Sequence, residues 1–374
     1  VSCVGCHEQR YEAPRSRRVV LASRRPPSVI EPVAGVPDVI DFPRDIQPIL
    51  DRHCVRCHGH ESVEVDGKRF GPMAGGLLLA GDRGPMFSHS YYGLTMAGQL
   101  ADGRNLRRSN YPPRTIGSSA SPLLARLDGA HHGARLSEGE KRIVRLWLDS
   151  GSVYAGTYAA LGTGSIGNYR NMGIDRSDLQ WPETKAARAA IQRRCAPCHK
   201  GSDALPDSPS DNKGMVPWGE GPMNALALHA TQRLNPHFRY NRHMVYNLDR
   251  PERSLMLLAP LSVCREGAHS AGKPTEGLPW ALYPSSNKER LTASLPAPVF
   301  ASADDADYQA ILAMIQRAAK RLREIKRFDM PHFRPDPAWV REMKRYGILP
   351  PDLPADAPID VYAAERAYWR SFWK

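Results

Sequence analysis

Six of the seven cysteines in this 374-residue chain fall into three copies of one short motif, Cys-x-x-Cys-His. This spacing is typical of covalent haem attachment, in which two thiols bond to the porphyrin edge and the next histidine binds the iron. The sequence therefore predicts three c-type haems. The predicted attachment residues are Cys3, Cys6, Cys54, Cys57, Cys195 and Cys198, and the predicted iron ligands from the motifs are His7, His58 and His199.

Two other uses of paired cysteines fit the motifs less well. A zinc site needs two such pairs converging on one ion, and it does not require a histidine directly after each pair. A redox disulfide of the thioredoxin type follows a strand and lacks that histidine. Because c-type haem is attached outside the cytoplasm in bacteria, we expect an exported protein, periplasmic or otherwise extracytoplasmic.

Composition favours a mainly α-helical chain with short helices and long loops, because proline (33) and glycine (30) are frequent. The formal net charge is +12, but Lys and Arg form no basic block interleaved with aromatic residues, so we expect no nucleic-acid partner. The longest apolar run, residues 254–263, is too short to cross a bilayer, so we expect no transmembrane segment. The chain starts at Val1 without a signal peptide, and we expect a processed protein or a piece of a longer one.

The second and third motifs each follow an amphipathic stretch that we expect to be helical. Residues 45–53 lead into the second motif, and residues 186–194 lead into the third. Such a helix delivers the haem motif in class I cytochromes c. His53 aligns with Arg194 in this comparison, so we expect His53 to pack or cap rather than to bind iron.

The segment after the second motif contains candidates for the sixth ligand of its iron. Residues 121–130 lead to the pair His131–His132, and a helix is expected from Lys141, with Ser137 and Glu140 as its capping box. In single-haem cytochromes c the loop between two such helices holds the sixth ligand. We therefore expect His131 or His132 to complete a bis-histidine second haem.

The same pattern recurs after the third motif. His131 lies ten positions after Ser121, and Cys264 lies ten positions after Ser254, ahead of a closing helix expected from Asp307. Cys264 is therefore our first candidate for the sixth ligand of the third haem, because a metal lowers the pKa of a neighbouring thiol. The alternatives for this ligand are His243, His269 and Met330.

The first motif lacks a delivery helix and a distal loop of its own. Residues 12–40 after it are rich in proline and arginine and are expected to form an extended strap. Tyr11 follows His7 by four residues, which is one helical turn. A phenolate can bind haem iron, and a tyrosine in this place can equally pack on the porphyrin or bond a propionate. From spacing alone, both roles stay open.

Several longer stretches resemble one group of proteins. They are CVGCHEQRY, DFPRDIQPILDRHCVRCHG, SPLLARLDGAHHGARLSEGE, RPERSLMLLAPLS, RFDMPHFRPD and WVREMKRYGILP. Together they are similar to the C-terminal multihaem region of proteins related to the hydrazine synthase alpha subunit of planctomycetes, over essentially the whole chain. The resemblance implies that Tyr11 binds the first iron, that His7 turns toward a zinc ion, and that the second haem is bis-histidine.

The chain departs from that group in two ways. The upstream domain and β-propeller that supply part of the active site in the alpha subunit are not in this sequence, and the third haem motif is additional. The resemblance therefore gives little support to hydrazine synthesis itself.

The predicted fold is a mainly α, cytochrome c-like multihaem protein with two class I-like haem units, an N-terminal haem segment and long loops. Its expected parts are an N-terminal haem-binding strap (1–40), a unit for the second haem (41–160), a linker (161–182), a unit for the third haem (183–330) and a C-terminal wrap (331–374).

The motifs favour an exported trihaem cytochrome that transfers electrons within a larger redox complex, with redox proteins or other subunits as partners. The alternative is a haem oxidoreductase of hydrazine-synthase-like type, whose first haem is open to a small nitrogen compound and whose catalytic residues are Tyr11 and His7. The aromatic segment 361–374 either docks to a partner or caps the fold.

Overall fold

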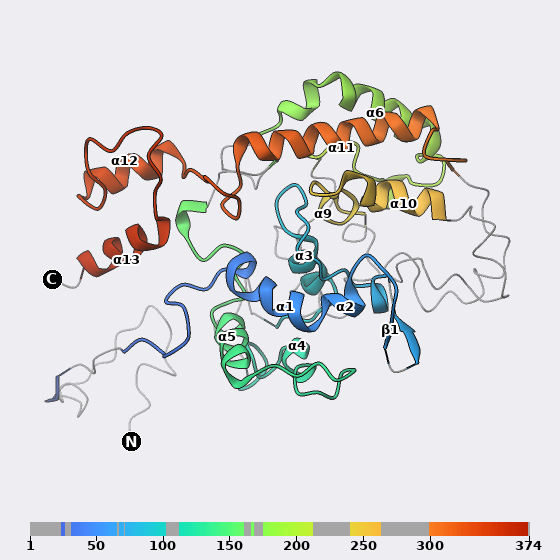
Figure 1. The fold of residues 1–374 in the computed structure, drawn as a ribbon. Coiled ribbons are helices and arrows are strands. Elements are labelled where there is room, and N and C mark those ends of the chain that lie inside the picture. The colour runs from blue at the N-terminus through green and yellow to red at the C-terminus, as the bar shows by residue number, and fades with distance from the viewer. Residues whose placement is uncertain are drawn as a thin grey trace. The chain divides into compact units, whose positions relative to one another are not determined.

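The computed structural model describes residues 24–26, 31–65, 67–70, 72–101, 112–160, 166–167, 175–211, 240–262 and 299–372 (Figure 1). The contacts divide the chain into two compact units, Val1–Asp38 and Val39–Lys374. In the described part of the first unit, the amide of Val36 donates to the carbonyl of Val33 at 3.1 Å, which closes a turn. Four predicted residues of the first haem site, Cys3, Cys6, His7 and Tyr11, lie outside the described residues.

The second unit is mainly helical, which confirms the helical part of the predicted fold class. Its first elements are η2 (Phe42–Ile46), α1 (Gln47–His53), α2 (Val55–His58), η3 (Ala74–Gly76), α3 (His89–Met96), α4 (Pro122–Ala125), α5 (Glu138–Asp149) and η4 (Tyr158–Ala160). The described strands, β1 (Val63–Val65) and β2 (Lys68–Phe70), form an antiparallel pair in which Val63 faces Phe70. Continuous helical turns therefore run from Phe42 into the second motif, as the amphipathic pattern predicts.

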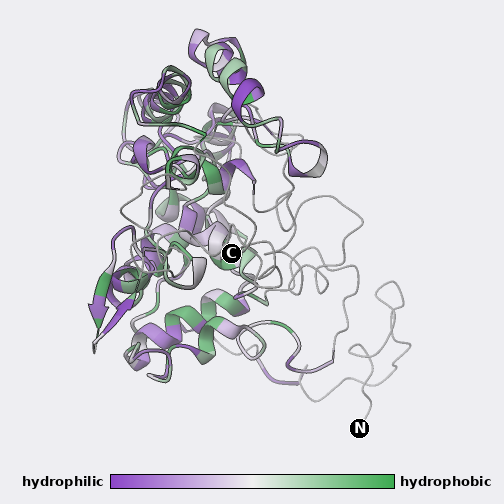
Figure 2. Ribbon diagram, turned by 90° about the vertical axis from the view of Figure 1, so that its right-hand side faces the viewer, coloured by the Kyte–Doolittle hydropathy of each residue, from purple (hydrophilic) through white to green (hydrophobic). Residues whose placement is uncertain are grey.

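The later elements of this unit are also helical. They are η5 (Ser177–Gln180), α6 (Pro182–Arg194), η6 (Gly201–Asp203), α9 (Arg242–Val245), η8 (Pro251–Arg253), α10 (Leu255–Ser262), α11 (Ala306–Ile325), α12 (Pro337–Arg345) and α13 (Val361–Ser371). Both polar and apolar residues occur within most of these helices, as expected for helices that bury one face (Figure 2). In the ranges given above, no helix is both long enough and apolar enough to cross a membrane.

An aromatic cluster forms the core where η2, α3 and α5 meet. Phe42 is fully buried, and its ring centroid lies 5.0 Å from that of Tyr91 and 5.4 Å from that of Trp147. The indole nitrogen of Trp147 donates to the carbonyl of Val153 at 2.8 Å, so this large ring is buried without losing its hydrogen bond. The cluster fixes the helix that leads into the second motif.

A long helix pair holds the third motif. Helix α11 lies along α6 (Figure 1), and Ile311, Met314 and Ile315 on its inner face are fully buried. The facing positions of α6 include Ala187 and Ala190, which are also fully buried. Small alanine side chains allow two helix backbones to approach closely, so bulky residues on one helix meet small residues on the other.

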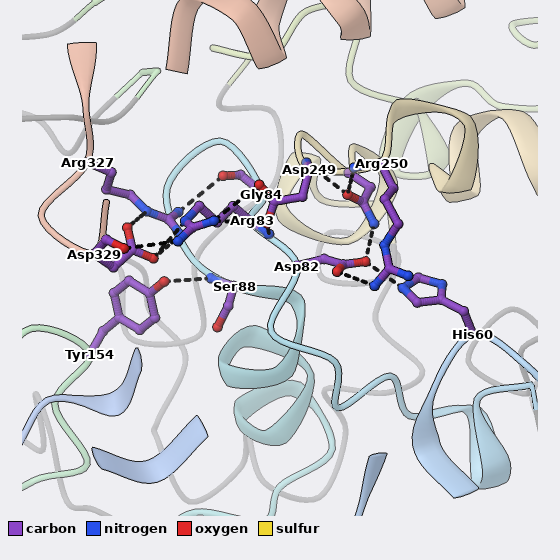
Figure 3. A network of polar contacts seen from close by, with 11 residues as sticks. His60, Asp82, Arg83, Gly84, Ser88, Tyr154, Asp249, Arg250, Arg327 and Asp329 are labelled. Carbon is purple, nitrogen blue, oxygen red and sulfur yellow. Dashed lines mark hydrogen bonds and ion pairs between the residues drawn. The ribbon is translucent and has the colours of Figure 1, made fainter. Parts of the chain in front are cut away.

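A buried ion network connects the loop before α3 with the turn after α11 (Figure 3). Arg327 is 1% exposed; its Nε donates to Asp329 at 2.7 Å and its Nη1 to the carbonyl of Gly84 at 3.2 Å. Arg83 Nε donates to the same carboxylate at 3.1 Å. Because these buried charges are paired and hydrogen-bonded, the network offsets the cost of removing them from water.

Asp82 is the centre of a second group of contacts in the same view (Figure 3). Its carboxylate lies 2.5 Å from His60 Nε2 and accepts from Arg250 at 2.5 Å and from Asn247 at 2.6 Å. Desolvation acts to raise the pKa of Asp82, but these hydrogen bonds outweigh it and hold the pKa well below its usual range. The chain just after the second motif is thereby tied to the chain just before α10.

Candidate haem-binding sites

The second and third motifs have the same backbone conformation. In both, the amide of the first cysteine, Cys54 or Cys195, donates to the carbonyl four residues earlier, at 2.8 and 2.9 Å. The amide of the histidine, His58 or His199, donates to the carbonyl of that first cysteine, at 3.0 and 2.8 Å. Each motif thus forms one tight turn at the end of its delivery helix, α1 or α6, and this turn brings two thiols and an imidazole together.

Both motif histidines also make the same side-chain contact. Nδ1 of His58 lies 3.2 Å from the carbonyl oxygen of Leu77, and Nδ1 of His199 lies 3.2 Å from that of Asp203. A carbonyl oxygen accepts and never donates, so each ring carries its proton on Nδ1 and keeps the lone pair on Nε2. A backbone carbonyl on the other nitrogen is the usual arrangement that orients a metal-binding histidine.

A cavity of about 340 Å³ lies beside the second motif, within the size range of ligand sites. The residues that border it include Cys54, Cys57 and His58 of the motif, and also His131 and His132. Its apolar wall is formed by Phe70, Leu77, Leu79, Leu94, Leu123 and Leu127. Thiols, two sets of imidazoles and an apolar wall around one cavity are the groups that a covalently attached haem requires.

The two rings that face each other across this site are His58 and His131. Their centroids are 6.0 Å apart and their planes differ by 22°. This centroid separation is of the size expected when one metal ion is bonded at about 2 Å to a nitrogen of each ring. His132 instead packs against Phe70, with centroids 4.8 Å apart, from a left-handed backbone position with φ 49°. Of the two predicted candidates, the geometry favours His131.

Burial shifts the protonation equilibria of the motif side chains. Burial raises the pKa of the Cys54 and Cys195 thiols to about 11, and the four described cysteines are free. Burial lowers the pKa of His58 although the Leu77 contact opposes it, and burial also lowers the pKa of His131. Both imidazoles are therefore neutral near pH 7, as an iron ligand must be.

The residue before each motif binds an acidic side chain at the start of the closing helix. His53 Nε2 lies 3.1 Å from Glu140 Oε1, which also accepts from Arg52 at 2.9 Å, and Glu140 stands in the capping box of α5. Arg194 donates at 3.1 Å to Asp305, which is the N-cap of α11. His53 and Arg194 therefore make equivalent contacts, each with an acidic residue at the start of the closing helix. The alignment of the two residues predicts a packing or capping role for His53. His53 also borders the cavity.

The third motif differs on the side that faces its histidine. Cys195 is buried and Cys198 is exposed. The ring of Tyr240 stands perpendicular to that of His199, with centroids 5.0 Å apart. Cys264 and His269, two predicted candidates for the sixth ligand, lie outside the described residues. No sequence pattern had distinguished Tyr240.

The structure places the other two candidates in the core. His243 on α9 is 1% exposed, and its ring lies 5.1 Å from Phe87 and 5.4 Å from Tyr92 between centroids. Burial lowers its pKa, and neither ring nitrogen has a hydrogen-bond partner among the residues described. Met330 packs against the main core in the turn after α11. His243 is thus a neutral imidazole held against α3.

Two polar residues of the cavity wall were not predicted. Arg126 Nε donates to Gln99 Oε1 at 3.0 Å, and both side chains border the cavity beside the second motif. A cation at the edge of an apolar cavity can pair with an anionic group of a bound molecule, such as a haem propionate. Their proximity depends on how the chain folds after α3, which local sequence patterns do not specify.

No cluster of three or more His, Cys, Asp or Glu side chains within the described ranges is arranged to hold a metal ion by itself. A haem iron takes four nitrogens from its porphyrin and needs the protein only for axial ligands. Comparison of the chain with protein-family models, with curated proteins and with solved structures finds no match.

Proposed function

We propose that this chain is an exported, periplasmic trihaem cytochrome c that transfers electrons as a subunit or domain of a larger redox complex. The observation that carries the proposal is the second site, where His58 and His131 face each other at 6.0 Å beside a cavity that Cys54 and Cys57 also border. The matching backbone and histidine contacts of the third motif support a second cytochrome c-like unit.

Different residues of the second site would attach a haem, bind its iron and contact its propionates. Cys54 and Cys57 would attach it, while His58 and His131 would bind its iron from opposite faces. Leucine side chains around the cavity exclude water, and Arg126 provides a positive charge for a propionate. A bound haem supplies one-electron chemistry at its iron, and two histidine ligands leave that iron no open position for a substrate. This is the arrangement of an electron carrier.

Haem content tests the proposal directly. We expect the protein, produced in a periplasm with c-type maturation enzymes, to retain three haems per chain after denaturation in acid and organic solvent. Replacing Cys54 and Cys57 by serine removes one haem, and the matched replacement of Cys195 and Cys198 removes a different one. Protein that folds and carries zinc but no covalent haem contradicts the proposal.

The haem oxidoreductase remains our second proposal, and it depends on the first motif, where Tyr11 follows His7 by four residues. On this proposal the reduced protein binds CO rapidly at one haem in three, and Tyr11→Phe changes the spectrum of that haem alone. Absence of CO binding contradicts this proposal and leaves the electron carrier.

A further inference from the structure

Exposed aromatic side chains gather at one place on the second unit. Among the described residues, five large apolar side chains are exposed, and three of them, Tyr346 (55%), Trp369 (52%) and Phe372 (62%), surround Tyr368. The ring of Tyr368 lies 5.6 Å from Tyr346, 5.4 Å from Trp369 and 5.0 Å from Phe372 between centroids. We call these four residues the aromatic patch. Contiguous exposed apolar surface of this kind marks interaction sites, whereas single exposed residues do not.

The helix that carries most of the patch is fixed to the protein. At the start of α13, Tyr362 hydrogen-bonds to the Asp41 carboxylate, and the Arg44 guanidinium stacks 4.1 Å above the Tyr362 ring. Glu365 is buried and accepts from the amide of Ala159 at 3.3 Å. The anchored first turns therefore hold Trp369 at the far end of the helix in solvent.

Exposed arginines adjoin the patch in sequence, since Arg345 precedes Tyr346 and Arg370 follows Trp369. Arg341 and Arg345 are 71% and 74% exposed, and each lies 3.6 Å from Glu342, so the two cations share one anion. Arg370 is exposed and makes no ion pair with the other described residues. The surface therefore combines tryptophan, tyrosine and phenylalanine rings with exposed arginine side chains.

We propose that the aromatic patch is a docking surface for an anionic lipid bilayer, which the protein binds from one side without crossing it. Tryptophan and tyrosine favour the boundary between lipid and water, and arginine is attracted to anionic headgroups. In a symmetric dimer through the patch, Arg341, Arg345 and Arg370 would face the same arginines of the second copy. The repulsion between these like charges opposes self-association. The proposal does not depend on haem.

Sedimentation with lipid vesicles tests the proposal on the full chain. One set of vesicles contains phosphatidylcholine alone, and in the other about one third of the lipid is phosphatidylglycerol. We expect binding to the anionic set only, weakened by salt. Trp369→Ala with Phe372→Ala should lower the partition coefficient at least about tenfold, and Arg370→Gln about fivefold.

The matched control is Ile116→Ala, which removes an exposed apolar side chain (40%) elsewhere and should leave vesicle binding unchanged. Circular dichroism and thermal melting establish that each variant is folded. The proposal is overturned if the protein binds neither vesicle, binds both equally, or binds anionic vesicles equally well in the double variant. It is also overturned if ultracentrifugation shows a dimer that the double variant dissociates, because a second copy then covers the patch.

Discussion

The second and third motifs share a local conformation and differ in their surroundings. In both, a helix ends at the first cysteine, the histidine amide closes the same turn, and Nδ1 of the histidine meets a backbone carbonyl at 3.2 Å. Facing His58 is the imidazole of His131 at 6.0 Å, whereas beside His199 stands the phenol ring of Tyr240 at 5.0 Å. One motif therefore occurs in two distinct environments.

This difference between the two sites shows which of their contacts arise from residues close together in the sequence. The side that carries the cysteines and the motif histidine follows from a helix, two cysteines and one turn, all within a few neighbouring residues. The opposite side is supplied by chain far away in the sequence, such as the loop that holds His131. The same local turn can therefore occur with different residues opposite its histidine, and on the proposed haem binding that difference would set the redox properties of each iron.

The largest expected effect comes from removing the histidine that distinguishes the second site. On the proposed bis-histidine ligation of the second haem, we expect His131→Ala to convert that haem from low-spin to high-spin iron, because only His58 would then remain as a protein ligand. His132→Ala is the matched control and should leave the spectrum unchanged, since His132 packs on Phe70. Low-temperature EPR measures the change as a loss of about one third of the low-spin signal if all three irons are low-spin. The reverse pattern in the two variants would assign the ligand to His132.

The next effect tests whether the region of the second motif, which includes Arg83, unfolds together with the region of the third motif, whose helix α11 leads to Arg327. Arg327 is 1% exposed, and its Asp329 partner is also bound by Arg83 from the second-motif region. We expect Arg327→Met to lower the free energy of unfolding by about 3–5 kcal/mol, because the carboxylate stays buried after its main partner is removed. Urea denaturation followed by circular dichroism measures this loss.

An exposed ion pair provides the control for that prediction. Arg341→Met, at a site 71% exposed and 3.6 Å from Glu342, should change the free energy of unfolding by less than about 0.5 kcal/mol. Two separated unfolding transitions in the Arg327 variant would indicate that the ion network normally makes the second-motif and third-motif regions unfold together. Two transitions already in the unmodified protein would show that the regions unfold independently.

Local patterns predicted much of this structure, and long-range contacts account for the rest. The helices before both motifs and the Ser137–Glu140 capping box formed where the apolar spacing and capping residues indicated. The choice between His131 and His132 needed the left-handed turn at His132, which no sequence pattern showed. The ion network around Arg327 joins residues more than 240 positions apart, so only the folded chain reveals it.

A smaller effect concerns acid stability at the second motif. Desolvation raises the pKa of Glu140, but hydrogen bonds from Ser137, Arg52 and His53 outweigh it and hold the pKa at about 2. A carboxyl whose pKa is lower in the folded than in the unfolded state stabilises the protein above its ordinary pKa of 4.5, and this stabilisation is lost as pH falls toward 2.

We therefore expect Glu140→Gln to cost about 1 kcal/mol at pH 7 and almost nothing near pH 2. Urea midpoints measured across this range give the comparison. A cost that stays constant with pH would assign the loss to packing rather than to charge. At the third motif, Asp305→Asn removes the charge that pairs with Arg194 and is the parallel variant.

The smallest effect tests whether the residues before the two motifs are equivalent. His53 pairs with Glu140 and Arg194 pairs with Asp305, both at 3.1 Å. We expect His53→Gln and Arg194→Gln each to lower the free energy of unfolding by about 0.5 kcal/mol, because both pairs are partly exposed. Neither variant should alter the low-spin haem spectrum. A spectral change in the His53 variant alone would mean that His53 interacts with the iron, and the two attachment sides would then differ as well as the two opposite sides.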